Sequence, residues 1–330
     1  MKSPSRRLIG SCLLLILACL LLTFWGLCSG AVTLSFSQLF SALSGDAPRA
    51  ITMVVIEWRL PRVMMALLLG TALGVSGAIF QSLMRNPLGS PDVMGFNTGA
   101  WSGVLVAMVF LGQHLTTITL AAMAGGILTS LLVWALAWRE GIDTFRLIII
   151  GIGVRAMLMA FNTWLLLRAS LETAVSAGLW FAGSLNGLTW AKIWPAAPVM
   201  IIMLACSALL VRRLRLLEMG DDSACALGVR VEYSRLLLML VAVVLTASAT
   251  ALAGPISFIA LVAPHIAHRL SGTTRWGLTQ AALCGALLLS AADFCAQQLF
   301  LPYQLPVGVV TVSLGGIYLI VLLIQESRKK

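Results

Sequence analysis

The sequence predicts an all-α polytopic membrane protein with about ten transmembrane helices, and two observations support this fold class. Of the 330 residues, 60% are hydrophobic and only 10% are charged, and the mean hydropathy of +0.99 lies far above the values of soluble globular domains. Apolar runs close to the roughly 20 residues that a helix needs to cross a bilayer recur about ten times. Membrane-spanning strands would be about ten residues long with alternating polarity, so the spans are expected to be helical.

Ten spans are predicted along the chain. They cover residues 8–28, 61–83, 93–111, 116–138, 146–167, 193–211, 236–253, 256–270, 278–299 and 306–324. The first span follows the basic segment "MKSPSRR" and, at 21 residues, is too long for the core of a typical signal peptide, so it is expected to remain in the mature protein. The eighth span is short and has Pro255 and Pro264 near its ends, which indicates a broken or partly inserted helix.

Basic residues set the expected orientation of these spans. With both termini in the cytoplasm, 16 of the 22 Lys and Arg residues fall in cytoplasmic segments, five fall outside and one, Arg155, lies inside a span. This distribution follows the positive-inside rule. The net charge of +10 therefore reflects orientation in a membrane, and no nucleic-acid partner is expected.

Several classes of function are disfavoured by the composition. No composition shift marks a soluble domain, so residues 1–330 are predicted to form a single transmembrane domain. No lysine follows a glycine, which excludes the phosphate-binding loop of a P-loop ATPase. The three histidines and seven cysteines show neither a CxxC pair nor a complete set of metal ligands, so no metal or cofactor is expected. No catalytic arrangement of side chains can be identified either.

Small residues recur at helical spacing in two spans. Gly70 and Gly74 form one small-xxx-small pair, and Gly95, Gly99 and Gly103 form a longer stripe. Close packing of helices within the chain is the favoured interpretation, and a dedicated dimer face is the alternative.

Three arginines lie at positions where a charge needs an explanation. Arg59 and Arg62 flank a proline at the outer start of the second span, where they either bind carboxylates of a partner or anchor the helix end at the interface. Arg155 lies inside the fifth span, where its guanidinium either extends to the cytoplasmic surface or lines a pathway for an anionic cargo. For both sites the two interpretations remain open.

The segment "LEMGDDSACALGV", residues 217–229, is predicted to form a short surface helix in a cytoplasmic loop. Gly220 and Gly228 are its expected limits, Asp221 is its expected N-cap, and Asp222 favours the positive end of the helix. The segment lacks the ligand spacing of a calcium loop, and no pocket for a catalytic acid can be identified around it. A helix that docks onto a partner is therefore the favoured interpretation.

Five stretches carry a resemblance to a known family: "RLPRVMMALLLGTALGVSGAIFQSLMRNPLGSPDVMGFNTGA", "LEMGDDSACALGV", "GPISFIALVAPHIAHRL", "GALLLSAAD" and "LPVGVVTVSLGGIYLIVLL". With these motifs the sequence resembles, over nearly its whole length, the permease subunits of ABC importers for iron-siderophore complexes, heme and cobalamin. Within that family it is most similar to the permeases for ferric enterobactin.

The resemblance implies a type II ABC importer permease of the bacterial inner membrane, a non-catalytic translocation subunit. It implies as partners a second, homologous permease subunit in a heterodimer, two ATPase subunits, a periplasmic siderophore-binding protein and membrane lipid. The implied substrate is a ferric siderophore, with ferric enterobactin expected and another iron chelate, heme or cobalamin as alternatives. An ATP-independent secondary transporter is disfavoured, because it would carry coupling acids within its spans and only Asp293 lies well inside one.

Carried over residue by residue, the resemblance implies two docking sites. Arg59 and Arg62 match the family arginines that receive acidic groups of the binding protein. The segment that docks on the ATPase is matched by Glu218, Gly220, Asp221, Asp222, Ala226 and Gly228.

The sequence departs from the family motifs at three positions. Gln297 stands where an outward-facing arginine is common, Gln304 replaces an acid, and His268 replaces an arginine. Because of Gln297, one of the arginines that the family uses to dock the binding protein is absent from this chain. This fits a heterodimer in which the two different permease subunits contribute unequally to the docking site.

Overall fold

The structure, a computed structural model, describes residues 4–30, 33–138, 144–272, 277–299 and 303–327, and helices make up almost all of it. Each of the ten predicted spans coincides with a helix, which confirms the predicted fold class. These helices are α1 (Pro4–Cys28), α4 (Leu60–Met84), α5 (Phe96–Val106), α6 (Leu115–Ala137), α7 (Thr144–Arg168), α9 (Trp190–Glu218), α11 (Val231–Ala253), α12 (Ile259–Ser271), α13 (Leu278–Gln298) and α14 (Val307–Ser327).

Length and composition of these helices fit a membrane. Among the described residues, seven helices are long and apolar enough to cross a bilayer, and two shorter apolar helices cover Phe96–Leu111 and Val307–Leu322. The helix of the uncertain eighth span, α12, has 13 residues and begins only at Ile259 after irregular backbone at 254–258. The predicted break in this span is therefore present at its start.

Shorter elements connect the spans. They are α2 (Phe36–Ser44), α3 (Arg49–Thr52), η1 (Met53–Arg59), η2 (Pro91–Met94), η3 (Ala107–Leu111), α8 (Leu171–Phe181) and α10 (Asp221–Ala226). The stretches 29–60 and 168–192, predicted only as connections between spans, thus contain helices of their own. Two of these begin at serine caps: the Ser35 hydroxyl accepts from the amide of Gln38, and the Ser170 hydroxyl accepts from the amide of Thr173.

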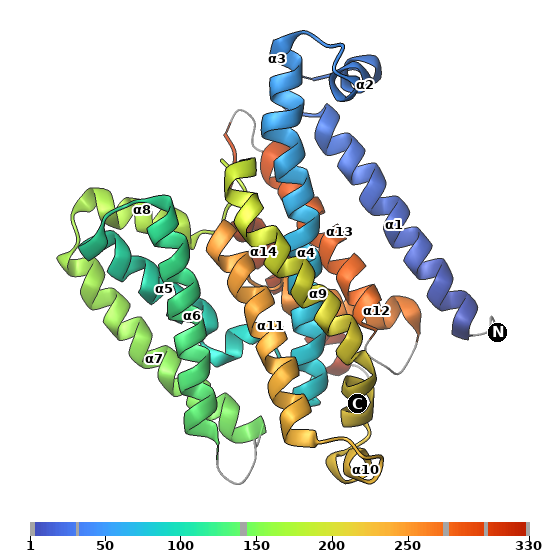
Figure 1. The fold of residues 1–330 in the computed structure, drawn as a ribbon, viewed down its shortest axis with the longest axis vertical. Helices are drawn as coiled ribbons and strands as arrows, with labels where there is room; N and C mark the ends of the chain where they lie inside the picture. The colour runs from blue at the N-terminus through green and yellow to red at the C-terminus, as the bar shows by residue number, and fades with distance from the viewer. Residues whose placement is uncertain (1–3, 31–32, 139–143, 273–276, 300–302, 328–330) are drawn as a thin grey trace.

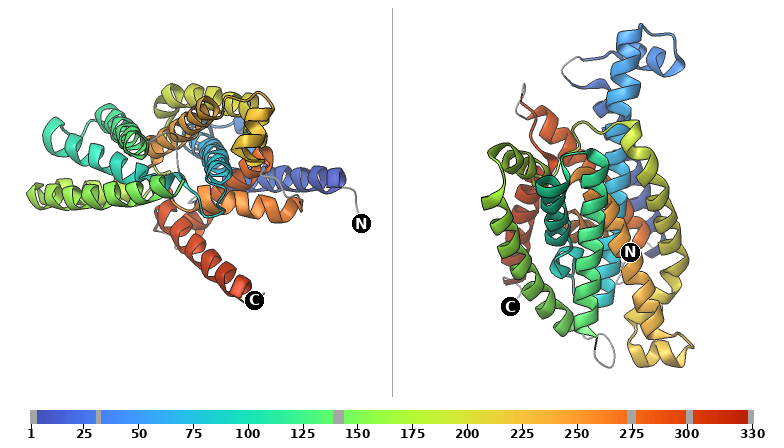
Figure 2. Two further views of the ribbon diagram at one scale, coloured as in Figure 1. Left: turned by 90° about the horizontal axis from the view of Figure 1, so that it is seen from below. Right: turned by 60° about the vertical axis from the view of Figure 1, so that its left-hand side comes forward.

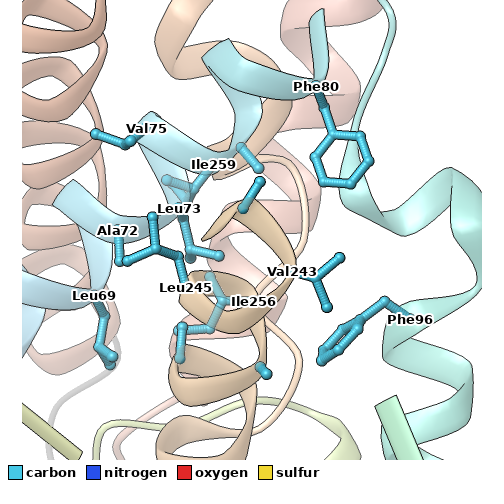
Figure 3. Close-up of a cluster of buried hydrophobic side chains, with 14 of the residues drawn as sticks. Leu69, Ala72, Leu73, Val75, Phe80, Phe96, Val243, Leu245, Ile256 and Ile259 are labelled. Atoms are coloured by element: carbon cyan, nitrogen blue, oxygen red, sulfur yellow. The ribbon is translucent and has the colours of Figure 1, made fainter. Parts of the chain in front are cut away.

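Helix α4 is the centre of the molecule (Figure 1). It packs against α9, α11, α12 and α13, and 78% of its most apolar stretch is buried, whereas only 11% is buried for α1. Leu69, Phe80 and their neighbours on α4 form the core with Phe96 of α5 and Leu245 of α11 (Figure 3). Figure 2 shows α1 and α14 running outward from this group. Their apolar side chains face outward, as expected for surfaces that contact lipid or another membrane subunit.

The two glycine stripes pack helices together within the chain. Gly70 and Gly74 bring α4 into backbone contact with Ala281 and Gly285 of α13, and Gly99 and Gly103 do the same between α5 and α6. A Cβ at any of these four positions would overlap backbone or side-chain atoms of the neighbouring helix. For these four glycines the structure therefore shows the favoured interpretation, which is close packing of helices within the chain.

Replacing Gly74 with valine is expected to lower the free energy of unfolding by about 1–3 kcal/mol or more, because the added atoms force α4 and α13 apart. The thermal unfolding midpoint in detergent measures this effect. Gly10→Val is the matched control, since a Cβ at Gly10 of α1 meets nothing within 4 Å. Equal midpoints for the two variants would contradict the assignment of Gly74 to a tight helix crossing.

Candidate functional site

The predicted docking segment forms a short helix at one end of the molecule, below α9 and α11 (Figure 1). Gly220, with φ of +113°, separates it from α9, and Gly228, with φ of +80°, ends it, so both glycines occupy backbone conformations that other residues rarely adopt. The predicted limits of the helix are therefore confirmed. The predicted N-cap is wrong: Gly220 is the N-cap, and Asp221 is the first helical residue.

Asp221 connects α10 to two of the spanning helices. Its carboxylate accepts from Arg85 Nη2 at 2.6 Å and from Arg235 Nη2 at 3.1 Å. These arginines lie at the end of α4 and in the second turn of α11. The carboxylate is thereby used for tertiary contacts, which explains why it does not cap its own helix.

A second contact joins the end of α9 to α4. Ser82 of α4 donates its hydroxyl proton to Glu218 at 2.9 Å, and the Arg85 guanidinium also donates to the Leu217 carbonyl oxygen at 3.1 Å. We call the five residues Ser82, Arg85, Glu218, Asp221 and Arg235 the coupling network. Sequence reasoning identified only the two acids, because nothing in the sequence shows which basic or hydroxyl side chains they meet.

The docking segment also has exposed residues that do not belong to the coupling network. Asp222 and Ala226 are exposed, and Asp222 makes no side-chain hydrogen bond or ion pair within the described part of the chain. Leu227 is 59% exposed, whereas Ala224 is fully buried against the rest of the molecule. A partner that approaches α10 from outside could therefore contact Asp222, Ala226 and Leu227, and it could also reach the Asp221 side chain, which is 46% exposed.

On the opposite end of α4, Arg62 belongs to a buried ion pair. Its Nη2 lies 2.8 Å from Oδ1 of Asp293 on α13, and the two side chains are only 13% and 4% exposed. Gln297 donates its amide to Asp293 at 2.8 Å, and Gln304 accepts from Arg62 at 3.2 Å. We call these four residues the outer polar cluster. Two of the three departures from the family motifs thus lie in one cluster, where neutral amides complete the hydrogen bonding of an ion pair.

Arg59 has its own contacts within the chain. Its Nη1 donates to the carbonyl oxygens of Leu27 at 2.8 Å and Cys28 at 3.2 Å, at the carboxyl end of α1. A cation at this position suits the negative end of the α1 dipole. The structure therefore gives Arg59 and Arg62 different surroundings, and their role in docking a binding protein stays a prediction.

Arg155 lines a cavity of about 720 Å³. The walls come from η2, α5, α7, α8 and α14 together with the irregular segment before α12. Helix α7 runs close to η2 here, since a Cβ at Gly95 would lie 3.4 Å from that of Arg155. Arg155 thus lies at a cavity, and both interpretations of its role stay predictions.

The cavity wall opposite the apolar residues of α14 carries a polar chain. Asn97 donates its amide to Asp92 and accepts from the Thr250 hydroxyl at 3.1 Å, and both Asp92 and Asn97 line the cavity. Burial raises the pKa of the Asp92 carboxyl in the connection between α4 and α5 to about 6, while Arg155 and the hydrogen bond from Asn97 oppose this rise. Burial therefore opposes ionisation of the Asp92 carboxyl, whereas the neighbouring Arg155 and Asn97 favour it.

Phe258 forms part of the same cavity with a strained backbone. Its φ of +70° lies in the left-handed region, which costs an aromatic residue about 1–3 kcal/mol. Strain of this kind persists only where the surroundings fix the conformation, and it concentrates at functional sites. No sequence signal identified this residue.

Comparison with known proteins identifies the family of the chain. Residues 15–325 match the model of the FecCD transport family. The chain belongs to this family. It is 82% identical to the ferric enterobactin transport system permease protein FepG of Escherichia coli (strain K12), over 99% of both chains. It is 38% identical to the achromobactin transport system permease protein CbrC of Dickeya dadantii (strain 3937), over 91% of this chain and 86% of the relative.

The fold of this FecCD family chain is also similar to that of a solved structure. An inward-facing conformation of a metal-chelate type ABC transporter superposes with a TM-score of 0.83 and 26% sequence identity, covering 98% of this chain and 99% of that one. Membership of the FecCD family confirms the resemblance drawn from the five sequence motifs. It leaves the roles of the individual docking and pathway residues as predictions.

Proposed function

We propose that this chain is the transmembrane permease subunit of an ATP-driven ABC importer that moves ferric enterobactin from the periplasm to the cytoplasm. The observation that carries the proposal is the 82% identity, over 99% of both chains, to a ferric enterobactin permease. The chain is a multi-pass protein of the bacterial inner membrane and a transport subunit without catalytic activity of its own. Its partners include an ATPase and a substrate-binding protein.

The proposed cargo is tested by uptake in cells that lack this chain. Loss of labelled ferric catecholate uptake, with ferric hydroxamate uptake unchanged, is the expected result, and the gene for this chain should restore it. Normal ferric catecholate uptake without the chain would contradict the proposal. Loss of hydroxamate uptake alone would assign another iron chelate as the cargo.

We further propose how the chain is assembled. Residues 1–330 form a single permease domain with both termini in the cytoplasm, and a second, homologous permease subunit completes a heterodimer above two ATPase subunits. The unequal distribution of basic residues supports the orientation. The cavity between α7 and α14 supports a second subunit, because both helices expose apolar side chains in this region, Met159 one turn from Arg155 on α7 and Val312 on the cavity wall of α14.

We propose that the two ends of α4 lie next to two different docking sites, one for the ATPase and one for the binding protein. The exposed side chains of α10 would contact the ATPase, and the coupling network would pass its movement to α4, α9 and α11. The outer ends of α4 and α13 would receive the binding protein, with Arg59 and Arg62 as the docking residues. Arg59 and Arg62 lie at the start of α4, and Ser82 and Arg85 lie at its end, where they contact Glu218 and Asp221, and this separation supports the division.

Arg155 would lower the electrostatic barrier for an anionic cargo in the cavity. Replacing Arg155 with glutamine is expected to reduce ferric catecholate uptake about tenfold, which corresponds to a loss of ~1.4 kcal/mol of stabilisation at the barrier. Arg155→Lys should retain most of the uptake, because it keeps the charge. Met157→Gln is the matched control on the same helix, since Met157 is exposed and does not line the cavity. Unchanged uptake in Arg155→Gln, with normal assembly, would rule out this role.

A further inference from the structure

We propose that the pocket between the last turns of α9 and the start of α11 binds the phosphate of an anionic phospholipid of the cytoplasmic leaflet. The pocket has a volume of about 310 Å³ and is lined by Arg213, Gly228, Val229, Arg230, Tyr233 and Ser234. The pocket includes Gly228 and Val229, the last two residues of the docking segment, and none of the residues of α10. The proposal rests on the orientation proposed above and is independent of the cargo.

The charge of the pocket favours an anion. Arg213 comes from α9 and Arg230 from the connection to α11, so two separate elements each contribute an arginine to the lining of one cavity. Neither arginine forms an ion pair within the described part of the chain, and no acid lines the pocket. Guanidinium groups bind phosphate oxygens with strong, charge-assisted hydrogen bonds.

Neutral donors in the pocket point to the same ligand. Ser234 is only 1% exposed, and its hydroxyl has no hydrogen-bond partner among the described residues. The pocket also contains the amino end of α11, a helix of 23 residues whose N-cap residue, Arg230, makes no side-chain capping bond. The free amides of that first turn and the helix dipole favour an anion at this position. A buried hydroxyl, uncapped amides and two guanidinium groups together match the several acceptor oxygens of a phosphate.

The surroundings identify the source of the phosphate as a lipid. Leu209 lies one turn from Arg213 on α9 and is 81% exposed, and Leu240 lies two turns from Tyr233 on α11 and is 51% exposed. These apolar side chains continue from the pocket along the spanning parts of both helices, where acyl chains would lie. Tyr233 itself is 54% exposed, as is typical of aromatic residues at the membrane interface. A soluble anion would gain nothing from this apolar continuation.

The test measures lipid retention by the full chain purified with its partner subunits. Native mass spectrometry after addition of phosphatidylglycerol or phosphatidylcholine with identical acyl chains is expected to show preferential retention of phosphatidylglycerol. Arg213→Gln and Arg230→Gln should each lower the bound phosphatidylglycerol about tenfold, the effect of losing a charge-assisted hydrogen bond to the phosphate in the pocket. Arg212→Gln is the matched control, because Arg212 is the exposed neighbour that does not line the pocket.

Three outcomes would overturn the proposal. They are equal retention of the two lipids, an equal loss in Arg212→Gln, and binding of inorganic phosphate without any preference between lipids, which would assign the pocket to a free anion. Co-purification of the ATPase with each variant shows that the assembly is intact. Since the measurement needs no siderophore, failure of the proposed cargo would leave its result unaffected.

Discussion

Replacing Arg62 with alanine is expected to destabilise the protein by about 3–5 kcal/mol, which is a large part of the stability of a typical folded protein. Asp293 is only 4% exposed in the structure, and the substitution removes its cationic partner and leaves Gln297 as its one side-chain hydrogen-bond donor among the described residues. A buried charge that loses its counterion keeps the full cost of its removal from water. The thermal unfolding midpoint of the purified chain should fall accordingly.

Two further variants separate the buried charge from other effects. Arg49→Ala removes an exposed arginine on the same side of the molecule and should leave the midpoint unchanged. The double variant Arg62→Gln/Asp293→Asn replaces the ion pair with two amides and should recover most of the stability, because no unpaired charge remains. An unaltered midpoint in Arg62→Ala would show that the ion pair contributes nothing to stability.

The same double variant tests the docking role of Arg62. If Arg62 receives a carboxylate of the binding protein, the double variant should be stable but should bind that protein more weakly. If the residue acts only within the outer polar cluster, the double variant should be both stable and fully able to bind. The low exposure of Arg62, 13%, means that a partner must compete with Asp293 for its guanidinium.

Hydropathy predicts the ten spanning helices because the requirement for crossing a bilayer, a long apolar run, can be read from a local stretch of sequence. A helical span needs a run of about 20 mostly apolar residues to cross the hydrocarbon core, whichever helices it packs against. The helices α2 and α8 have no such requirement and are only 9 and 11 residues long, so their serine caps alone do not distinguish them from turns.

The sequence predicts those parts of the candidate site that depend on local backbone conformation. It does not predict the side-chain contacts between segments that are far apart in the chain. Gly220 and Gly228 mark the limits of α10 because few other residues adopt their backbone angles. The partner of Arg62 lies 231 residues further along the chain, and no local pattern connects the two. Asp221 was expected to cap its helix, but the arginines that hold it come from α4 and α11, 136 residues before it and 14 after it.

Reversing the charge of Asp221 is expected to abolish uptake while leaving the fold intact. Asp221→Arg places a third guanidinium between Arg85 and Arg235, so the attraction that holds α10 to α4 and α11 becomes repulsion. The pair of Arg85 and Asp221 is nearly half exposed, and such pairs are worth only about 0–1 kcal/mol. Arg235 is only 11% exposed but keeps Glu232 as an acidic partner 3.6 Å away, so the thermal unfolding midpoint should fall by less than in Arg62→Ala. The measured quantities are uptake of ferric catecholate and ATP hydrolysis by the reconstituted assembly.

Asp222→Arg is the matched control, with the same change of charge at the next position. Asp222 is exposed and has no side-chain partner in the described part of the chain, so its reversal acts only on an approaching partner. We expect Asp222→Arg to reduce co-purification of the ATPase. Asp221→Ala, in contrast, should retain the ATPase but lose transport, because the contacts from α10 to the spanning helices are removed while the exposed surface is kept.

This pair of variants decides how movement would pass from the ATPase to the pathway. Arg85 ends α4, the most deeply buried helix, so a displacement of α10 that acts through Asp221 reaches the centre of the molecule directly. If both variants lose the ATPase equally, the two acids form one docking surface and the coupling network has no separate role. If Asp221→Ala transports normally, the remaining contacts, such as that of Ser82 with Glu218 and the packing of Ala224, are enough to transmit the movement. Loss of transport with the ATPase still bound is the result that assigns coupling to the contacts of Asp221.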